Sequence, residues 1–530
     1  MAAIKVSIKE LEELSHLKIK ELEEILTSIG VPIESKDSDN LELEITPNRP
    51  DLLSVEGLAR ACYCFKKGVL PNYRAKNSKI NLFVDNSVKD VRPFIGGALI
   101  ENVKLNQNFL ESLIQLQEKI HQTLGRKRKK VAIGLHDISK AKPPFYYFAT
   151  SSLSISFIPL GFDEPLNCLQ ILEKHPKGIE YRGLINSKFP LLKDSASNIL
   201  SFPPIINSEF TKITPQTKSI FIDCTGTDQN TVLFVVNIFA ALFADRGATV
   251  YQIKINNRPY TLFKKIKTKY NPDFANKILG INLNLQEQKK LLLKMGHILK
   301  GKFVFSPAFR TDILDQIDIV EDLAIAYGYN NFKPIFPEFF SIGKEKEEFE
   351  NISELLVGSG FLEVCSWILT NKKVLQKANC TENLLEVSNP LTEDFSVLRP
   401  FLYPNFLEIF SISKSSKMPQ KIFEIGPIIQ DKSDKIIQQT NACFALCSPK
   451  ANITEFLGVV SGIFKSMGID YKIEQTNHPS FISGRVGKII VNDLYVGLVG
   501  EVHPEVLEKF SIEQPVVVCE LFLDELKKLI

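Results

Sequence analysis

Hydrophobic residues recur with helical spacing in several stretches of this chain, and each stretch stops at a glycine. The clearest cases are Leu22 to Ile29 before Gly30, Phe109 to Leu124 before Gly125, Phe274 to Leu279 before Gly280, and Leu285 to Met295 before Gly296. Apolar side chains three and four residues apart share one face of a helix. Glycine favours the left-handed conformation that ends a helix. The pattern therefore predicts amphipathic helices over these ranges.

Shorter runs between the helices predict strands. Leu41-Glu-Leu-Glu-Ile45 alternates with period two, and Val131 to Leu135 is a continuous apolar run. The runs Lys488 to Val491 and Leu494 to Val499 flank Asn492-Asp493, which predicts a hairpin. A chain of 530 residues is too long for one core. We therefore predict a multidomain α+β protein with the following regions: a small N-terminal α+β module over 1–75, an α/β unit with an antiparallel-rich sheet over 80–255, a small helical domain over 260–335, and a larger unit over 340–530 that alternates helices with strands.

One predicted helix and the turn before it hold five carboxylates within eleven residues, namely Asp312, Asp315, Asp318, Glu321 and Asp322. If the helix runs from Asp315 to Tyr327, a rotation of about 100° per residue places the last four acids on one arc of about 120°. Apolar side chains, Ile317 among them, fill most of the remaining circumference, and Gly328 would end the helix. The sequence predicts a buried helix with one acidic face.

The acidic face needs a counter-charge. One or two acids stabilise the first turn of a helix, but like charges three and four residues apart repel one another by roughly a few tenths of a kcal/mol per pair. Oxygen ligands of this kind suit Mg²⁺. An arginine-rich surface on a partner would neutralise the acids equally well, so the residues leave both alternatives open.

Composition narrows the class of protein. Hydrophobic residues at 44% and charged residues at 24% are typical of a globular chain, and a net charge of +3 does not by itself indicate nucleic acid. The nine cysteines include no Cys-x-x-Cys spacing, which predicts a reducing compartment. The longest apolar run, Val232 to Ala244, is interrupted by Asn237 and too short to span a bilayer. We expect a cytoplasmic protein with no membrane segment.

Several segments spread along nearly the whole chain resemble the β subunit of phenylalanyl-tRNA synthetase in its archaeal and eukaryotic form. They appear in the order of that family: Thr46-Pro-Asn-Arg-Pro-Asp-Leu-Leu-Ser-Val-Glu-Gly57, Gly125-Arg-Lys-Arg-Lys-Lys-Val-Ala-Ile-Gly-Leu-His-Asp137, Ser201-Phe-Pro-Pro-Ile-Ile-Asn207, Phe309-Arg-Thr-Asp-Ile313, Asp318 to Asn330, and His478-Pro-Ser-Phe-Ile-Ser-Gly-Arg485. The resemblance implies an editing-like domain over 80–255, a B5-type domain over 260–335 and a class II synthetase-like, non-catalytic domain over 340–530.

The resemblance also implies partners and a metal. In that family the β subunit works with an α subunit as an α₂β₂ assembly on tRNA(Phe), and the acidic cluster is a magnesium site shared with the α subunit. The expected Mg²⁺ ligands in this chain are Asp312, Asp318, Glu321 and Asp322.

A run of five basic residues follows a predicted helix end directly: Arg126, Lys127, Arg128, Lys129 and Lys130. Such runs are usually solvated surface, and cations are favoured at the end of a helix. Phosphate contacts also need a cluster of this kind. We predict that these residues contact the tRNA backbone.

Polar side chains gather in turns beside apolar strands at Ser201 to Asn207 and Phe221 to Asp228. This composition suits a pocket with a few oriented polar groups. The resemblance makes this region an editing domain, which hydrolyses tyrosine wrongly attached to tRNA(Phe), and a site that hydrogen-bonds the phenol hydroxyl would give the selectivity. We expect Ser201, Asp223 and Thr225 to line the pocket, with Glu180 and His136 as weaker candidates. No spacing marks a nucleophile, so a positioned water is the expected attacking group.

The last region lacks the residues of a working class II site. Ile422-Phe-Glu-Ile-Gly426 has no arginine to bind ATP phosphate, and Gly497 to Gly500 is not followed by one. We therefore expect the α subunit to carry the aminoacylation chemistry. Two alternatives stay open: a scaffold whose editing pocket is inactive, and a metal-dependent phosphohydrolase centred on Asp312 to Asp322.

Overall fold

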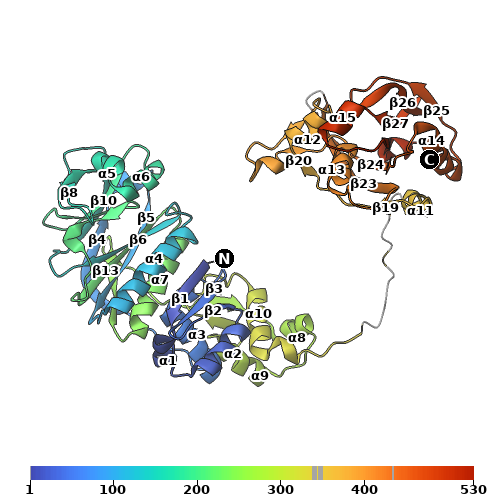
Figure 1. Ribbon diagram of the computed structural model, residues 1–530. Helices are drawn as coiled ribbons and strands as arrows, with labels where there is room; N and C mark the ends of the chain where they lie inside the picture. The colour runs from blue at the N-terminus through green and yellow to red at the C-terminus, as the bar shows by residue number, and fades with distance from the viewer. Residues whose placement is uncertain (1, 337–342, 344–349, 433–434, 530) are drawn as a thin grey trace. The chain divides into compact units, whose positions relative to one another are not determined.

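The computed structural model describes residues 2–336, 343, 350–432 and 435–529, which form two compact units, Met1–Phe336 and Pro337–Ile530 (Figure 1). Helices and strands are mixed in both units, so the predicted α+β multidomain class is confirmed. No helix within these described ranges has the length and apolar content that a membrane crossing needs.

The first unit begins with a three-stranded antiparallel sheet of order β1-β3-β2, covered by three helices. Its elements are β1 (Ala2–Ser7), α1 (Ile8–Ser15), α2 (Ile19–Ser28), β2 (Ile33–Lys36), β3 (Asn40–Ile45) and α3 (Val55–Lys67). Ser54 caps α3 by accepting a hydrogen bond from Gly57 N at 3.1 Å. A Cβ on Gly57 would lie 1.9 Å from the carbonyl oxygen of Asp51, so only glycine lets the preceding turn pack this closely.

A ten-stranded sheet forms the middle of the first unit, in the order β12-β11-β10-β7-β4-β14-β5-β13-β6 with β15 paired to β14. Its strands are β4 (Lys76–Val84), β5 (Phe94–Glu101), β6 (Val131–Asp137), β7 (Phe145–Thr150), β10 (Phe189–Lys193), β11 (Ile199–Phe202), β12 (Ile206–Asn207), β13 (Ser219–Gly226), β14 (Thr249–Ile255) and β15 (Arg258–Pro259). Only β14 with β4 and β4 with β7 pair in parallel, so the predicted antiparallel-rich sheet is confirmed.

Two long helices lie along this sheet, α4 (Gln107–Gln122) and α7 (Gln229–Asp245) (Figure 1). Helix α7 contains the apolar run Val232 to Ala244, and most of its side chains are buried. Leu113 of α4, Phe239 of α7 and Ile222 of β13 belong to one hydrophobic core that also includes the N-terminal module. The segment that connects β7 to β10 contains β8 (Ser156–Phe157), β9 (Leu166–Asn167), α5 (Cys168–Lys174) and α6 (Pro176–Tyr181).

The first unit ends with a three-stranded antiparallel sheet of order β16-β18-β17 against three helices. The elements are β16 (Ile266–Lys269), α8 (Pro272–Leu279), α9 (Leu285–Lys294), β17 (Ile298–Lys300), β18 (Phe303–Ser306) and α10 (Gln316–Tyr327). The acidic helix is α10, which Asp315 caps and Gly328 ends as predicted. Ile317 is 47% exposed, so its predicted place on a buried face is wrong.

The second unit is built on a seven-stranded sheet of order β19-β23-β24-β28-β27-β26-β25, antiparallel except where β19 meets β23. The strands are β19 (Leu362–Glu363), β23 (Gln420–Lys432), β24 (Lys435–Cys447), β25 (Lys472–Gln475), β26 (Phe481–Val491), β27 (Leu494–Val502) and β28 (Val516–Phe522). The β26–β27 hairpin turns at Asn492 and Asp493, both with positive φ, as predicted.

Helices cover both faces of this sheet because side chains alternate along its strands. Cys443 and Ala445 of β24 pack with α12 (Lys372–Lys377) and α13 (Tyr403–Ile412). Ala442 and Phe444 pack on the other face with α11 (Glu350–Gly358), α14 (Ile453–Ser466) and α16 (Leu523–Leu526). A small sheet of β20 (Leu369–Thr370), β22 (Val397–Leu398) and β21 (Leu385–Glu386) and the helix α15 (Pro504–Lys509) complete the described part of this unit.

A buried carboxylate sits at the start of α13. Glu520 of β28 is 1% exposed and accepts hydrogen bonds from Leu402 N at 3.0 Å, Tyr403 N at 3.2 Å and Asn441 Nδ2 at 2.6 Å. Burial raises the pKa of Glu520 to about 7, and these donors only partly oppose the rise. Its folded pKa therefore lies above its unfolded value of 4.5.

This shift predicts a pH dependence of the second unit. The stabilising contribution of protonated Glu520 is fully present below pH 4.5 and is lost as the pH rises through about 7. The loss amounts to about 3 kcal/mol in the free energy of unfolding. Glu520→Gln should remove it, so that the variant gains stability relative to the parent chain as the pH rises. Urea denaturation followed by the fluorescence of Trp367, the one tryptophan in the sequence, measures this unit. An identical pH dependence in both proteins would contradict the prediction.

Candidate functional site

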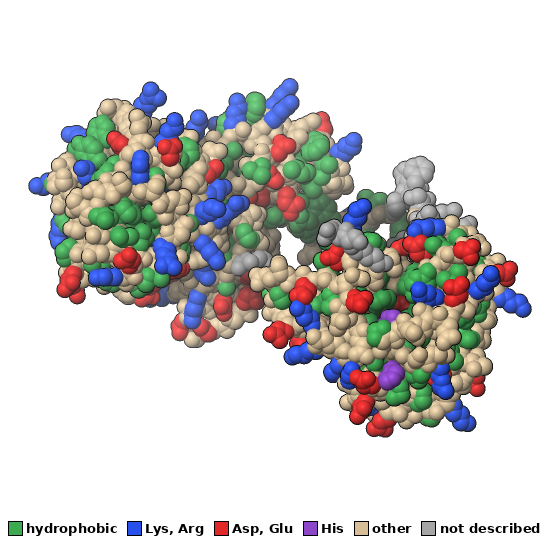
Figure 2. Space-filling model, turned by 90° about the horizontal axis from the view of Figure 1, so that it is seen from above, with side chains coloured by type: hydrophobic (Ala, Val, Ile, Leu, Met, Phe, Trp, Pro, Cys, Tyr) green, Lys and Arg blue, Asp and Glu red, His purple; other side chains and the backbone are tan. Residues whose placement is uncertain are grey.

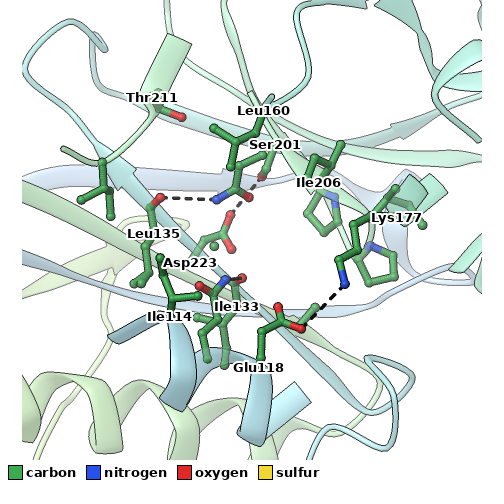
Figure 3. A pocket seen from close by; sticks show the side chains of 18 of the residues that line it. Ile114, Glu118, Ile133, Leu135, Leu160, Lys177, Ser201, Ile206, Thr211 and Asp223 are labelled. Carbon is green, nitrogen blue, oxygen red and sulfur yellow. Dashed lines mark hydrogen bonds and ion pairs between the residues drawn. The ribbon is translucent and has the colours of Figure 1, made fainter. Parts of the chain in front are cut away.

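A cavity of about 470 Å³ lies where the ends of the ten-stranded sheet approach one another beside α4 (Figure 3). Strands β6, β11, β12 and β13 contribute its walls, and Asn207 Nδ2 of β12 donates to the Leu135 carbonyl of β6 at 3.3 Å. Most of the lining is apolar, including Ile114, Ile133 and Ile206. The cavity has the size and composition of a small-molecule pocket.

Ser201, Asp223 and Thr225 all line this cavity. Asp223 is 2% exposed, and its Oδ2 accepts hydrogen bonds from Ser201 Oγ at 3.1 Å and from His136 Nε2 at 3.2 Å. Figure 3 shows Ser201 and Asp223 facing one another. No described residue donates to Asp223 Oδ1, so this oxygen can accept a hydrogen bond from a ligand.

Glycine is required opposite Asp223. Gly134 of β6 is the register partner of Asp223, and a Cβ on Gly134 would lie 2.6 Å from Asp223 Oδ1 and 2.7 Å from His136 Nε2. A side chain at this position would therefore displace the carboxylate and occupy its open side. The absence of a side chain at Gly134 keeps Oδ1 accessible.

Thr225 is held from behind by a buried arginine. Arg92 Nε donates to Thr225 Oγ1 at 2.9 Å, and Arg92 NH2 donates to the Thr225 carbonyl at 2.7 Å. Burial lowers the pKa of Arg92 to about 10. These bonds fix the rotamer of Thr225 and add positive charge below the floor of the cavity.

A second polar group of side chains lines another part of the cavity. Arg128 donates to Glu118 at 2.8 Å. Lys177 lies 3.9 Å from the same carboxylate (Figure 3). The pKa of Glu118 is lowered to about 2, first by its hydrogen bond with His121 and then by the charge of Arg128, against the opposing effect of burial. The cavity thus combines the polar end at Asp223, apolar walls and a charged end.

The basic run divides into a buried residue and exposed ones. Arg128 is buried, donates to the carbonyls of Pro204 at 3.2 Å and Ile205 at 2.8 Å, and lies 4.6 Å over the ring of Tyr181. Arg126, Lys127 and Lys129 are exposed, and Lys130 lies 3.8 Å from Asp228. The structure gives Arg128 a role in the pocket wall, and contact of the run with tRNA stays a prediction.

The two weaker candidates lie in different places. His136 is fully buried behind Asp223, with Nδ1 2.8 Å from Thr211 Oγ1. Glu180 lies on the exposed side of α6, outside the cavity lining, and pairs with Lys177 at 3.2 Å. Ser201 and His136 each contact Asp223 and not one another, so they do not form a nucleophilic triad.

The four predicted metal ligands do not converge. Asp312 receives two hydrogen bonds from Arg310, at 2.9 and 2.6 Å, and Asp322 bonds Arg310 at 2.6 Å and His297 at 2.5 Å. The other two acids also have partners, because Asp318 accepts from Leu314 N and Asp315 N, and Glu321 accepts from Tyr329. Within the described ranges no group of three or more His, Cys, Asp or Glu residues could hold a metal ion. The residues as placed do not fit a magnesium site.

Sequence reasoning missed several residues of the cavity. Glu118, Gly134 and Lys177 lie far from Asp223 along the chain, and no local motif links them to it. The one available signal was Gly134 inside a strand pattern, which often marks a close approach of another group.

Comparisons with known proteins agree with the fold. The family model described as the tRNA synthetase B5 domain matches residues 268–329, and that of the phenylalanyl tRNA synthetase beta chain CLM domain matches residues 341–523. The phenylalanine–tRNA ligase beta subunit of Pyrococcus abyssi is 39% identical and covers 98% of this chain and 96% of its own. That of Methanocaldococcus jannaschii is 36% identical over 99% of this chain and all of its own. The crystal structure of an N-terminal fragment of the beta subunit from Pyrococcus horikoshii matches 62% of this chain and 99% of that fragment, at 37% identity and a TM-score of 0.59.

The fold and these matches define a multidomain chain of an aminoacyl-tRNA synthetase. More narrowly, the chain belongs to the family of phenylalanine–tRNA ligase beta subunits. The resemblance found in its sequence is confirmed, and with it the assignment to a ligase of protein biosynthesis.

The two arginines of the basic run should differ in their effect on stability. Arg128→Ala removes the buried contacts with Glu118 and two carbonyls, which should lower the free energy of unfolding of the first unit by about 3 kcal/mol. Arg126→Ala removes an exposed side chain and should change it by less than about 0.5 kcal/mol. Differential scanning calorimetry provides the measurement, with the transition of the second unit as an internal control. Equal shifts for both variants would contradict the structural role of Arg128.

Proposed function

We propose that this chain is the editing and assembly subunit of a phenylalanine–tRNA ligase. It would hydrolyse tyrosyl-tRNA(Phe) in the cavity around Asp223, while an α subunit makes phenylalanyl-tRNA(Phe) from ATP, phenylalanine and tRNA. The open carboxylate oxygen of Asp223 inside an apolar pocket is the single observation that carries the editing proposal. We further assign regions 1–75, 80–255, 260–335 and 340–530 to the N-terminal, editing, B5-type and synthetase-like domains.

Tyrosine and phenylalanine differ by one hydroxyl group, so selectivity needs an acceptor for that group. In the proposed complex the aromatic ring lies between the apolar walls and the phenol hydroxyl donates to Asp223 Oδ1. Ser201 and His136 hold the other carboxylate oxygen and so fix the direction in which Oδ1 points. A bound phenylalanine would leave Oδ1 of this buried carboxylate without a partner, which costs far more than the loss of one favourable contact.

The charged end of the cavity suits the remainder of the substrate. Arg128 Nε is a buried donor with no partner among the described residues, and Lys177 is half-exposed beside it. Lys177 can donate to oxygen atoms of the ester or of the terminal nucleotide, and the buried charge of Arg128 attracts them. In the reaction a water molecule attacks the ester carbonyl carbon, the bond to the ribose oxygen breaks, and tyrosine and the free 3′ end of the tRNA leave.

The C-terminal unit supports the division of labour between subunits. After residue 336 the sequence contains two arginines, Arg399 and Arg485. Arg399 is buried and donates to Glu424 at 2.7 Å, and Arg485 donates to Glu501 at 2.6 Å. Arg399 is thus engaged inside the fold and Arg485 pairs with a carboxylate, so neither forms part of a recognisable phosphate site, and in the proposed α₂β₂ assembly aminoacylation belongs to the α subunit.

Two further parts of the proposal concern Mg²⁺ and the location of the assembly in the cell. We derive no step from Mg²⁺, because Asp312, Asp318, Glu321 and Asp322 all have other hydrogen-bond partners. We place the assembly in the cytoplasm, where the nine cysteines, all free in the structure, would stay reduced.

Deacylation by the purified chain tests the editing proposal. The chain should release tyrosine from tyrosyl-tRNA(Phe) and leave phenylalanyl-tRNA(Phe) intact. Asp223→Asn keeps the size of the side chain but removes its charge, so the rate with the tyrosyl ester should fall by about 10². Loss of radiolabelled amino acid from acid-precipitable tRNA gives both rates.

Asp137→Asn is the matched control, because Asp137 lies on β6 but outside the cavity and accepts a hydrogen bond from Thr217. It should leave the rates unchanged. Release no faster than in a buffer blank would favour the alternative of a scaffold with an inactive pocket.

A further inference from the structure

Arg92 is a buried cation beside the cavity that makes no ion pair with a described residue. The residue lies in the segment before β5 and is 4% exposed, whereas lysines and arginines are interspersed with acids over the surface visible in Figure 2. Its guanidinium donates to the hydroxyl of Thr225 at 2.9 Å, to the carbonyl of Thr225 at 2.7 Å and to the carbonyl of Lys129 at 3.2 Å. All of these acceptors are neutral. A charge removed from water in this way is costly unless an opposite charge lies near it.

Asp223 is a buried charge of the opposite sign on the same face of the same strand. Asp223 and Thr225 are alternate residues of β13, so their side chains point to one face and start about 7 Å apart. Because the Thr225 hydroxyl is bonded to Arg92, the guanidinium lies on that face too. The carboxylate is bonded by Ser201 and His136 and by no arginine or lysine of the described residues. The two buried charges therefore stabilise one another through space.

The other titratable groups around Asp223 carry no fixed positive charge. Burial raises the pKa of Tyr147 on β7 and of Cys224 on β13, so both stay neutral near neutral pH. His136 on β6 donates through Nε2 whether its ring is neutral or protonated, so its charge is variable. Burial lowers the pKa of Arg92 to about 10, against the opposing effects of Tyr147 and Asp223, which leaves the guanidinium protonated. The cations at the other end of the cavity pair with a carboxylate there.

The charge of Asp223 decides what its open oxygen can do. Oδ2 already accepts two hydrogen bonds, so a proton added to the carboxylate would settle on Oδ1. Protonated Oδ1 is a donor, and a neutral group left without a partner costs less than a charged one. Phenylalanine would then be rejected less strongly. Discrimination in the proposed editing reaction therefore needs an ionised Asp223.

We propose that Arg92 is a positioning residue for the discrimination of tyrosine from phenylalanine, because its buried charge keeps Asp223 ionised and Oδ1 an acceptor. Arg92 acts across Thr225 and is not part of the cavity lining, so it touches no substrate. This inference rests on the proposed editing function, but the effect of Arg92 on Asp223 is measurable without that activity.

Carbon-13 NMR of the full chain, labelled at the carboxyl carbon of aspartate, follows the ionisation of Asp223 directly. The spectrum of Asp223→Asn identifies the signal by subtraction. Arg92→Met removes the charge and keeps a long side chain, and the titration midpoint of Asp223 should move to higher pH by about 1 unit. Arg92→Lys keeps the charge, and Thr225→Val removes only the intervening hydroxyl, so both should titrate within about 0.3 of the parent chain.

Deacylation of tyrosyl-tRNA(Phe) between about pH 5 and about pH 9 adds a readout that a structural role alone would not move. Loss of the cation favours the protonated form of Asp223, so the KM of Arg92→Met should be about tenfold above the parental value at the acidic end. The difference should close as the pH rises through both midpoints, and kcat should change by less than about threefold. Arg258→Met, at an exposed arginine of β15 in the same sheet, is the matched control and should behave like the parent chain throughout.

A parental Asp223 midpoint in folded Arg92→Met would overturn the proposal. A raised midpoint in Arg92→Lys would also overturn it, and this second test stands if thermal denaturation shows that the uncharged variant does not fold. A KM defect of Arg92→Met that is the same at every pH would contradict it too, since that pattern indicates a structural role. If the parent chain releases no tyrosine, the editing proposal fails, and the NMR titration still decides the effect of Arg92 on Asp223.

Discussion

The burial of the Asp223 carboxylate is the constraint on which the candidate site depends. A charged group removed from water is stable only if its oxygens are hydrogen-bonded. Ser201 from β11 and His136 from β6 supply two bonds to one oxygen, and Gly134 leaves space for the other. The approach of the sheet's two ends is therefore coupled to the polar chemistry of the cavity, since Asp223 bonds His136 of β6 at one end of the sheet and Ser201 of β11 near the other end.

A different buried ionic group stabilises the end of the first unit. Arg310 is 2% exposed and pairs with Asp312 and Asp322, and the charge of Arg310 holds the pKa of Asp322 well below its usual range despite burial. His297, which directly precedes β17, also bonds Asp322. Its other ring nitrogen lies 2.8 Å from Ser306 Oγ. The like charges of the acidic helix are thus partly neutralised inside the chain. Arg310 therefore provides, from within the chain, the counter-charge that the sequence analysis had expected from a metal ion or from a partner surface.

Local patterns predicted much of the fold, and long-range contacts limited the prediction of the site. Glycine stops placed the ends of α9 and α10 to within a residue or two, and Asn492-Asp493 placed the β26–β27 hairpin, because those signals act over a single turn. Ser201, Asp223 and Thr225 were found from the polar composition of their segments, although they lie within strands β11 and β13 and not in the turns that were predicted. Glu118 and Lys177 were missed, since only the tertiary fold brings them to the cavity. Arg128 was assigned to the surface from its basic neighbours, and its burial against Pro204 and Ile205 could not be read from that run.

The central claim is that the cavity holds an aromatic amino acid ester with its ring hydroxyl on Asp223. The most direct measurement is a crystal structure of the chain with a non-hydrolysable amide analogue of 3′-tyrosyl adenosine. The account predicts electron density in this cavity, with the phenol oxygen within hydrogen-bond distance of Asp223 Oδ1 and the adenosine toward Arg128 and Lys177. An analogue bound elsewhere, or bound here with its ring hydroxyl away from Asp223, would contradict it.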